Sequence, residues 1–197
     1  MAAGPIWSIA GGVPTVTRVY LIRHGQAEAG WSTQRDPGLN DTGRQQAYQA
    51  ARAFAQRGPL PIIVSPLRRA RETANEFETL WRRPATVDDR VAEIPSVGMT
   101  LAERGEWLKA LTQRRWQELD GVIQSWRGTA VASLLEISQD TVVVSHFMII
   151  NAVVSWVSGD ERVVCCQPLP GSRTTLERVG ETFRVVEVGA QGASTVL

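Results

Sequence analysis

The stretch VYLIRHGQAEAG, residues 19–30, places an arginine and a histidine directly at the end of an apolar run. The apolar run predicts a strand over residues 16–22. A buried strand gains nothing from Arg23 and His24, because a polar or charged group removed from water without partners is costly. We therefore expect these two side chains to serve a site at that edge of the sheet.

Two further apolar runs end in the same manner. The run PIIVS is followed within one turn by Arg68, and the run DTVVVS is followed directly by His146. Ligands of open α/β sheets bind outside the carboxyl ends of the strands, where helix N-termini also favour anions. We therefore expect both side chains to share one crevice with Arg23 and His24.

The order of strand-like and helix-like segments indicates the fold class. Helical patterns cover residues 39–58, 65–81, 100–139 and 146–159, with short strand-like runs between them. The last two strand-like segments, RTTLERV and TFRVVEV, are joined by a turn at Gly180 and predict an antiparallel edge pair. This alternation predicts an α/β protein of three layers, α/β/α, with a mostly parallel central sheet.

Local signals predict where two of the helices begin. Thr42 and Gln45 match a capping box, and the helix they open is expected to stop at Gly58. Ser65 is a suitable N-cap for the next helix, with Pro66 at its first helical position.

Length and charge limit the possible functions. The 197 residues suit a flexible leader over 1–15 and a single domain over 16–197. Lysine and arginine number 21 against 20 acidic residues, for a net charge of +1. This balance argues against a dedicated binder of nucleic acid or of an anionic membrane. The oligomeric state stays open.

The cysteines and the most apolar segment indicate the compartment. Cys165 and Cys166 are adjacent, which suits neither a loop-closing disulfide nor a metal site. We expect two buried thiols in a reducing cytoplasm. The apolar stretch TVVVSHFMIINAVVSWV is too short to span a membrane and is interrupted by polar residues, so it predicts a buried strand followed by a helix.

Several segments, in order along the chain, resemble the histidine phosphatase superfamily, the phosphoglycerate mutase-like group. They are LIRHGQA, LNDTGRQQA, IIVSPLRRARETA, VAEIP and VVVSHF, and the resemblance extends from about Val16 to Val188. It implies the phosphoglycerate mutase-like form of the α/β fold and an enzyme that transfers or hydrolyses a phosphoryl group.

The resemblance also implies roles for individual residues. His24 would attack phosphorus and become a phosphohistidine, and Glu93 would protonate the leaving alkoxide. Four side chains would bind the phosphorylated substrate: Arg23, Arg68, His146 and Gln26. Independently, a histidine with a pKa of about 6.5 is mostly neutral at pH 7 and so offers a lone pair. Other acids in the same region are rivals to Glu93: Asp89, Glu103 and Glu106.

Arginine side chains would supply the positive charge that other phosphatases obtain from a metal ion, since guanidinium groups match phosphoryl oxygens well. No motif with metal-ligand spacing is seen in the sequence, and we expect neither a metal nor another cofactor. The reaction expected is metal-independent hydrolysis of a small phosphomonoester.

Two alternatives remain open. Phe147 and Asn151 stand where the mutases and many relatives have Gly and Arg, which favours a phosphatase over a phosphomutase. A catalytically inactive module that binds a phosphorylated ligand is the third possibility.

The resemblance also implies a helical cap region at about 97–127, which leaves two questions open. Its arginines either reach a second anionic group of the substrate or form a solvated face: Arg104, Arg114 and Arg115. Its tryptophans either line a cleft or pack helices together: Trp107, Trp116 and Trp126.

Overall fold

The structure, a computed structural model, describes residues 16–30, 32–96 and 98–192, so the leader expected over 1–15 lies outside the described residues. Six strands form the sheet: β1 Arg18–Arg23, β2 Ile62–Val64, β3 Thr86–Val87, β4 Thr141–Ser145, β5 Arg173–Val179 and β6 Thr182–Glu187. The α-helices are α1 Asp41–Arg52, α2 Arg68–Trp81, α3 Leu101–Leu111, α4 Gly121–Leu135 and α5 Phe147–Ser158. Two short 3₁₀ turns are η1 Asp89–Val91 and η2 Trp116–Glu118.

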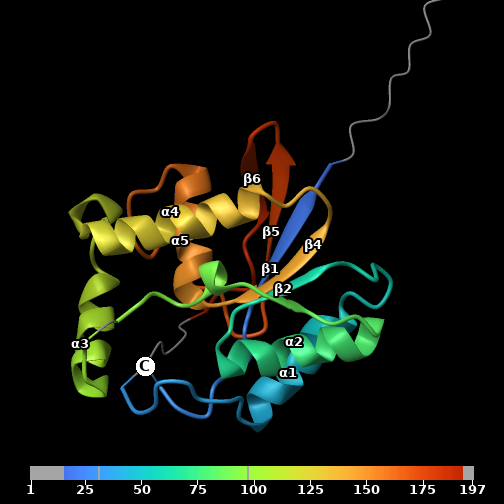
Figure 1. Cartoon of the computed structure of the whole chain (residues 1–197), viewed down its shortest axis with the longest axis horizontal. Coiled ribbons are helices and arrows are strands. Elements are labelled where there is room, and N and C mark those ends of the chain that lie inside the picture. Colours follow the sequence, from blue (N-terminus) through green and yellow to red (C-terminus); the bar gives the residue numbers. More distant parts are fainter. Residues whose placement is uncertain (1–15, 31, 97, 193–197) are drawn as a thin grey trace, which may run out of the picture.

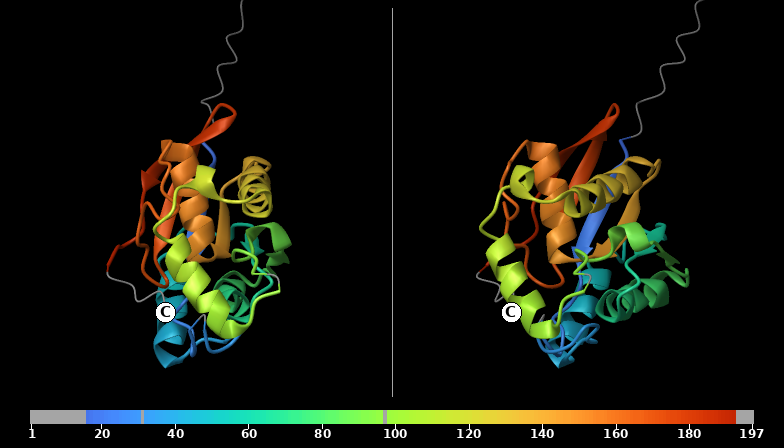
Figure 2. Two further views of the ribbon diagram at one scale, coloured as in Figure 1. Left: turned by 90° about the vertical axis from the view of Figure 1, so that its left-hand side faces the viewer. Right: turned by 60° about the vertical axis from the view of Figure 1, so that its left-hand side comes forward.

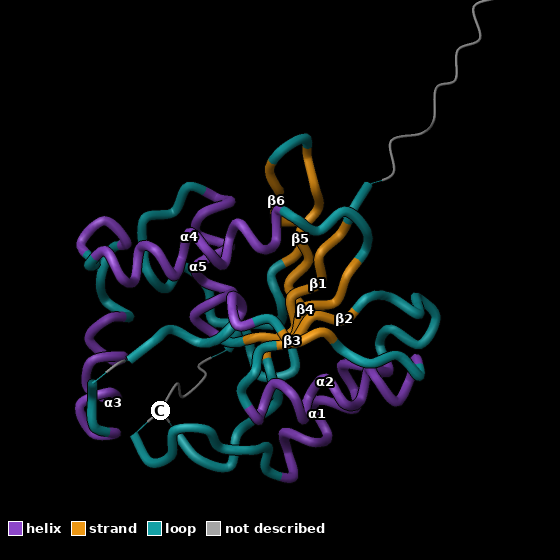
Figure 3. The backbone as a smooth tube through the Cα atoms, in the orientation of Figure 1, coloured by secondary structure: helices purple, strands orange, loops and turns teal. Residues whose placement is uncertain are grey.

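The sheet has the order β3-β2-β4-β1-β5-β6 (Figure 3). The pairs β2–β3, β2–β4 and β1–β4 are parallel, whereas β1–β5 and β5–β6 are antiparallel. The expected mostly parallel sheet with an antiparallel pair at one edge is therefore confirmed.

Helices cover both faces of the sheet, because neighbouring residues of a strand point to opposite sides. On one face, Tyr20 and Ile22 of β1 pack with residues of α1 and α2. On the other face, Val19 and Leu21 pack with residues of α4 and α5. Figure 1 shows these two helix pairs on opposite sides of the strands, which confirms the three-layer α/β/α arrangement.

Both predicted helix starts are wrong by a few residues. The N-cap of α1 is Asn40, whose side-chain oxygen accepts a hydrogen bond from the Gly43 N–H at 2.8 Å, so Thr42 lies inside the helix. The helix α2 begins at Arg68, and the Ser65 hydroxyl accepts from the Leu67 N–H at 3.3 Å in the turn before it. The end of α5 at Gly159, with φ of 70°, agrees with the prediction.

Residues 98–127 contain α3, η2 and the start of α4, and the expectation that this region forms a cap stays a prediction. Figure 2 shows α3 next to α5 at the side of the molecule, and Leu108 and Leu111 of α3 share a core cluster with residues of α5. The three tryptophans of the region belong to this cluster: Trp107, Trp116 and Trp126. They pack helices together, and none of the three lines the cavity that contains His24.

None of the helices in the described part of the chain is long and apolar enough to cross a membrane.

Candidate active site

The carboxyl ends of three strands meet at one edge of the sheet. The parallel register sets Arg23 opposite Ser145, and the His24 N–H donates to the Ser145 carbonyl at 2.9 Å. The structure thereby brings His24 and His146 together, with their ring centroids 5.1 Å apart, although 121 positions separate them in the sequence.

Hydrogen bonds define the protonation of His24. Its Nδ1 lies 2.7 Å from the Gly25 carbonyl oxygen, which can only accept, so Nδ1 carries the proton. Its Nε2 lies 3.1 Å from Nε of Arg69, which can only donate, so Nε2 carries the lone pair. Burial, and then the charges of Arg69 and Arg23, lower the pKa of His24. The ring is a neutral imidazole with its basic nitrogen among cations.

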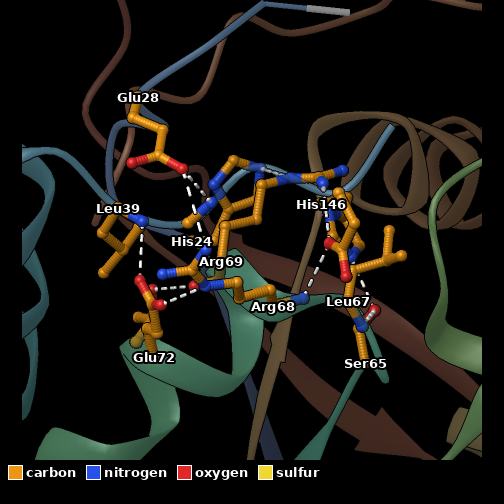
Figure 4. A network of polar contacts seen from close by, with 12 residues as sticks. His24, Glu28, Leu39, Ser65, Leu67, Arg68, Arg69, Glu72 and His146 are labelled. Atoms are coloured by element: carbon orange, nitrogen blue, oxygen red, sulfur yellow. Dashed lines mark hydrogen bonds and ion pairs between the residues drawn. The ribbon is translucent and has the colours of Figure 1, made fainter. Parts of the chain in front are cut away.

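The guanidinium group beside His24 belongs to Arg69, not to Arg68. The Arg68 side chain is exposed and donates from Nε to Glu72 at 2.7 Å, whereas Arg69 is 3 % exposed (Figure 4). Adjacent residues of a helix point about 100° apart, so only one of the two can face the crevice. The placement expected for Arg68 is therefore corrected, and Arg69 occupies it.

The sequence contains a signal for Arg69 that is visible in retrospect. Arg69, Thr73 and Phe77 follow one another at intervals of four and are all buried, whereas the exposed Arg68 pairs with the half-buried Glu72 at the same interval. Thr73 also accepts a hydrogen bond from the Gly25 N–H at 3.0 Å, which fixes this face of α2 against the end of β1.

His146 is fully buried, and its Nε2 lies 2.6 Å from the Ser65 hydroxyl oxygen (Figure 4). Burial lowers its pKa, with further contributions from Arg69 and His24, so this imidazole is also neutral. Ser65, expected to cap a helix, instead orients the second histidine of the site.

Arg23 is held from two sides. Its NH1 donates to the Pro168 carbonyl at 2.7 Å, and its guanidinium carbon lies 5.0 Å from the centroid of the Phe147 ring. Burial lowers the pKa of Arg23 to about 10, so the group remains a cation at neutral pH. Phe147, one of the two departures from the family pattern, thus covers a cation of the site.

Asn151, the other departure, has a structural role. Its side-chain oxygen accepts from the backbone N–H groups of Cys165 and Cys166 at 2.9 and 3.0 Å. The fully buried amide therefore ties α5 to the loop that follows it.

Glu93 is 7 % exposed and lines the cavity that also contains Arg23, His24 and Arg69. Hydrogen bonds hold the two residues that precede it in the segment: the Ser145 hydroxyl donates to the Val91 carbonyl at 2.7 Å, and the Trp126 indole donates to the Ala92 carbonyl at 3.1 Å. Burial raises the pKa of Glu93, although Arg69 and other cations oppose this effect. The rival acids do not line the cavity: Asp89, Glu103 and Glu106.

The cavity has a volume of about 540 Å³, within the range of small-molecule sites. Gln26, expected to bind substrate, lines it. Its charged lining among the described residues consists of four arginines and two glutamates: Arg23, Arg35, Arg69, Arg104, Glu28 and Glu93. The volume of this cavity and the excess of arginines in its lining suit an anion larger than a phosphate ion.

In the described part of the chain, no three or more side chains of His, Cys, Asp or Glu lie close enough together to hold a metal ion. The side chains around His24 include several guanidinium groups, which repel a metal cation and attract a phosphoryl group.

The curated relatives include phosphatases and a probable mutase. A glucosyl-3-phosphoglycerate phosphatase of Mycolicibacterium vanbaalenii is 40% identical over 82 residues, which cover 40% of this chain and 36% of the relative. A bifunctional protein of Mycobacterium tuberculosis is 38% identical over 120 residues, or 57% of this chain and 32% of the relative. The matches thus span about a third of the length of these relatives. A probable phosphoglycerate mutase of Erwinia tasmaniensis is 28% identical over 163 residues, 72% of this chain and 75% of the relative.

Solved structures agree on the fold. A phosphoserine phosphatase of Entamoeba histolytica, in complex with 3-phosphoglyceric acid, matches with a TM-score of 0.69 at 22% identity, over 92% of this chain and 100% of that one. The family model described as histidine phosphatase superfamily (branch 1) matches residues 19–191. Because the family model matches most of the chain, and because two histidines lie side by side at one edge of the sheet, the chain belongs to the histidine phosphatase superfamily.

Proposed function

We propose that this protein is a metal-independent phosphomonoester hydrolase that acts on a small phosphorylated substrate through a phosphohistidine at His24. The observation that carries the proposal is the lone pair on Nε2 of a buried, neutral imidazole beside the Arg69 guanidinium. In the free site Arg69 donates to that lone pair. An incoming phosphoryl oxygen is a stronger acceptor, so Arg69 turns to the oxygen and the lone pair becomes available.

In the first step Nε2 of His24 attacks phosphorus, and the bond from phosphorus to the ester oxygen breaks. The leaving alkoxide takes a proton from Glu93, whose raised pKa keeps the carboxyl protonated at higher pH than an exposed glutamate. In the second step a water molecule gives a proton to the Glu93 carboxylate and attacks phosphorus. The P–N bond then breaks, and inorganic phosphate leaves.

Charge in the transition state is stabilised by groups already in place. Arg23 and Arg69 are buried cations that line the cavity beside His24, and in this proposal they hold the phosphoryl oxygens together with His146, whose ring lies 5.1 Å from that of His24. These fixed cations supply the positive charge, so hydrolysis needs no metal ion. The free thiols Cys165 and Cys166 fit a protein of the reducing cytoplasm.

Turnover of p-nitrophenyl phosphate in excess EDTA tests this function. The native protein is expected to release p-nitrophenol at an unchanged rate in EDTA, and His24→Ala is expected to lose at least about a thousandfold in kcat. Activity that EDTA abolishes, or that survives in His24→Ala, contradicts the proposal.

A phosphomutase is the second candidate, supported by the relative from Erwinia tasmaniensis. Hydrolysis is favoured because Phe147 and Asn151 replace the Gly and Arg found in mutases, and both are committed to other contacts here. Incubation with 3-phosphoglycerate separates the two: a hydrolase releases inorganic phosphate, and a mutase yields the 2-phospho isomer with little phosphate. A module that only binds phosphorylated ligands would do neither.

A further inference from the structure

The two cysteines of the chain lie side by side in the loop between α5 and β5, and the proposed reaction uses neither of them. Both are free thiols; Cys166 is 6 % exposed and Cys165 is half-buried. Both thiols contact the same residue of α5: Cys165 Sγ lies 3.8 Å from the Asn151 carbonyl oxygen, and Cys166 Sγ lies 3.4 Å from the Asn151 side-chain oxygen. The two sulfur atoms are therefore held close together.

The surroundings of the pair make one thiol the more reactive. A hydrogen bond with the Cys166 thiol lowers the pKa of Cys165, whereas the same bond, together with burial, raises the pKa of Cys166. The thiolate is the form of cysteine that attacks an oxidant, and Cys165 is also the more exposed of the two. Cys165 is thus placed to react first, with the second sulfur within its reach.

A bond between the two sulfur atoms would disturb the backbone of the loop. Adjacent Cα atoms lie about 3.8 Å apart across a trans peptide, closer than the roughly 4.4–6.8 Å of ordinary disulfides. The peptide unit between Cys165 and Cys166 must therefore turn when the bond forms. Asn151 now accepts from the N–H groups of both cysteines, at 2.9 and 3.0 Å, and a turn of this unit breaks the bond from Cys166. A disulfide strained in this way is readily reduced again.

The residues that follow the cysteines reach the candidate active site. The Pro168 carbonyl accepts from NH1 of Arg23 at 2.7 Å, and the Gly171 N–H donates to the Arg23 carbonyl at 2.9 Å. Leu169 and Pro170 line the cavity that contains His24. A shift of the backbone at Cys166 thus displaces, two residues later, one of the contacts that orient Arg23.

We propose that Cys165 and Cys166 are an oxidation site at which a hydroperoxide forms a vicinal disulfide, and that this disulfide weakens the binding of phosphoryl groups beside Arg23. The second half of this inference rests on the proposed function, whereas the formation of the disulfide does not. Transient disulfides of cytosolic proteins commonly serve redox sensing, which agrees with a strained and reversible bond.

The oxidation proceeds in two steps. The Cys165 thiolate attacks one peroxide oxygen, the O–O bond breaks, and the other oxygen leaves and takes up a proton, so that Cys165 becomes a sulfenic acid. The sulfur of Cys166 then attacks the sulfur of Cys165, and the S–O bond breaks. The hydroxide that leaves takes the proton of the Cys166 thiol. With hydrogen peroxide, two thiols are oxidised to one disulfide and the peroxide is reduced to two water molecules.

Mass spectrometry of the intact chain and calorimetric titration with inorganic phosphate test the inference. Both are carried out on the reduced protein, after hydrogen peroxide, and again after dithiothreitol. We expect peroxide to remove two hydrogen atoms per chain without linking chains on a non-reducing gel. The affinity for phosphate should fall by about tenfold or more, since a charged hydrogen-bond donor loses its orientation, and dithiothreitol should restore it.

The two cysteines supply matched control variants. Cys165→Ser should form no disulfide, and its affinity for phosphate should equal that of the reduced native protein before and after peroxide. Cys166→Ser should also form no disulfide, but its Cys165 should be trapped as a sulfenic acid by dimedone. Cys165→Ser should give no dimedone adduct.

A peroxide-treated chain that keeps both thiols, or that forms its disulfide with another chain, would overturn the inference. A vicinal disulfide that leaves the affinity for phosphate unchanged, or an affinity that falls equally in Cys165→Ser, would also overturn it. Turnover of p-nitrophenyl phosphate is measured in parallel. Reduced protein that binds phosphate without turning over this ester contradicts the proposed hydrolase and not the oxidation site.

Discussion

At the scale of single residues, the site depends on which of two neighbouring arginines faces His24. Arg69 donates to Nε2 of His24, whereas Arg68 pairs with Glu72 at the surface. We predict that Arg69→Gln lowers kcat/KM for a phosphomonoester by about 100-fold or more, since it removes a buried charge from the transition state. Arg68→Gln is the matched control and should stay within about threefold of the native value. Steady-state kinetics checks both, and the reverse order would return Arg68 to the site.

Glu93 provides a second test at this scale, because a general acid matters most for a poor leaving group. Glu93→Gln cannot give up a proton, so the first step should slow by about 100-fold or more with an alkyl phosphate. With p-nitrophenyl phosphate, whose phenolate leaves without help, the same step should slow far less. Rapid-quench bursts measure the step directly, and equal losses on both substrates would remove Glu93 from this role.

The residues of the site illustrate what sequence can indicate. The sequence indicated that His24 and His146 would meet because each follows an apolar strand, and it indicated Glu93 because this residue lies in a family-like segment; their catalytic roles stay predictions. Arg69 could not be identified in this way, because the start of α2 decides which of two adjacent arginines faces the sheet. That start, at Arg68, depends on tertiary contacts and not on the Ser65–Pro66 signal.

At the scale of elements, the end of β1 must approach α1 closely for His24 to reach its position. A Cβ on Gly25 would lie 2.2 Å from the Gly43 carbonyl oxygen, and this clash could be relieved only if the backbone moved. We predict that Gly25→Ala lowers the free energy of unfolding by about 1–3 kcal/mol and reduces turnover. Gly128→Ala in α4 is the control: a Cβ there meets nothing within 4 Å, and stability should rise by about 0.5–1 kcal/mol.

Urea unfolding followed by circular dichroism measures both changes. A Gly25→Ala variant as stable as the native protein would mean that the loop after β1 moves freely away from α1.

The elements themselves were largely readable in the sequence, and their ends were not. The strands and helices alternate as the hydrophobic pattern indicates, and Gly159 ends α5 as expected. The start of α1 was misplaced because Asn40 also serves the loop from β1, donating to the Ala27 carbonyl at 3.4 Å, so a tertiary contact decides which residue caps the helix.

At the scale of the whole molecule, the parallel pairing of β1 with β4 brings the residues of the candidate site together. The register of β1 with β4 aligns Arg23 with Ser145, so segments more than a hundred positions apart end side by side. The sequence predicted this meeting because parallel strands share a carboxyl edge. It could not indicate which of Arg104, Arg114 and Arg115 would line the cavity, since burial of the first depends on the contact of α3 with the loop after β1.

Burial of the site also makes stability depend on pH. Folding lowers the pKa of His24 and His146 below 6.5, so the unfolded chain binds more protons below that pH. Their contribution to stability is fully present above pH 6.5 and is lost as the pH falls toward their folded pKa values. Glu93, with its pKa raised above 4.5, acts in the opposite direction: its contribution is present below pH 4.5 and is lost as the pH rises.

Because both histidines take up protons in the unfolded chain between pH 7.5 and pH 5.5, we predict a lower urea midpoint at pH 5.5 than at pH 7.5. The double variant His24→Asn, His146→Asn should show a smaller difference between the two pH values, whatever its absolute stability. An unchanged difference would mean that the buried imidazoles do not cause the pH dependence.

The phosphohistidine is the central claim, and mapping of the phosphorylated residue tests it most directly. The protein is mixed with a phosphomonoester, quenched within milliseconds under alkaline denaturing conditions, digested, and analysed by mass spectrometry. We predict one acid-labile phosphoryl group per chain on His24, and none in His24→Ala. A phosphoryl group on His146 or another residue, or phosphate release without any labelled intermediate, would contradict the account.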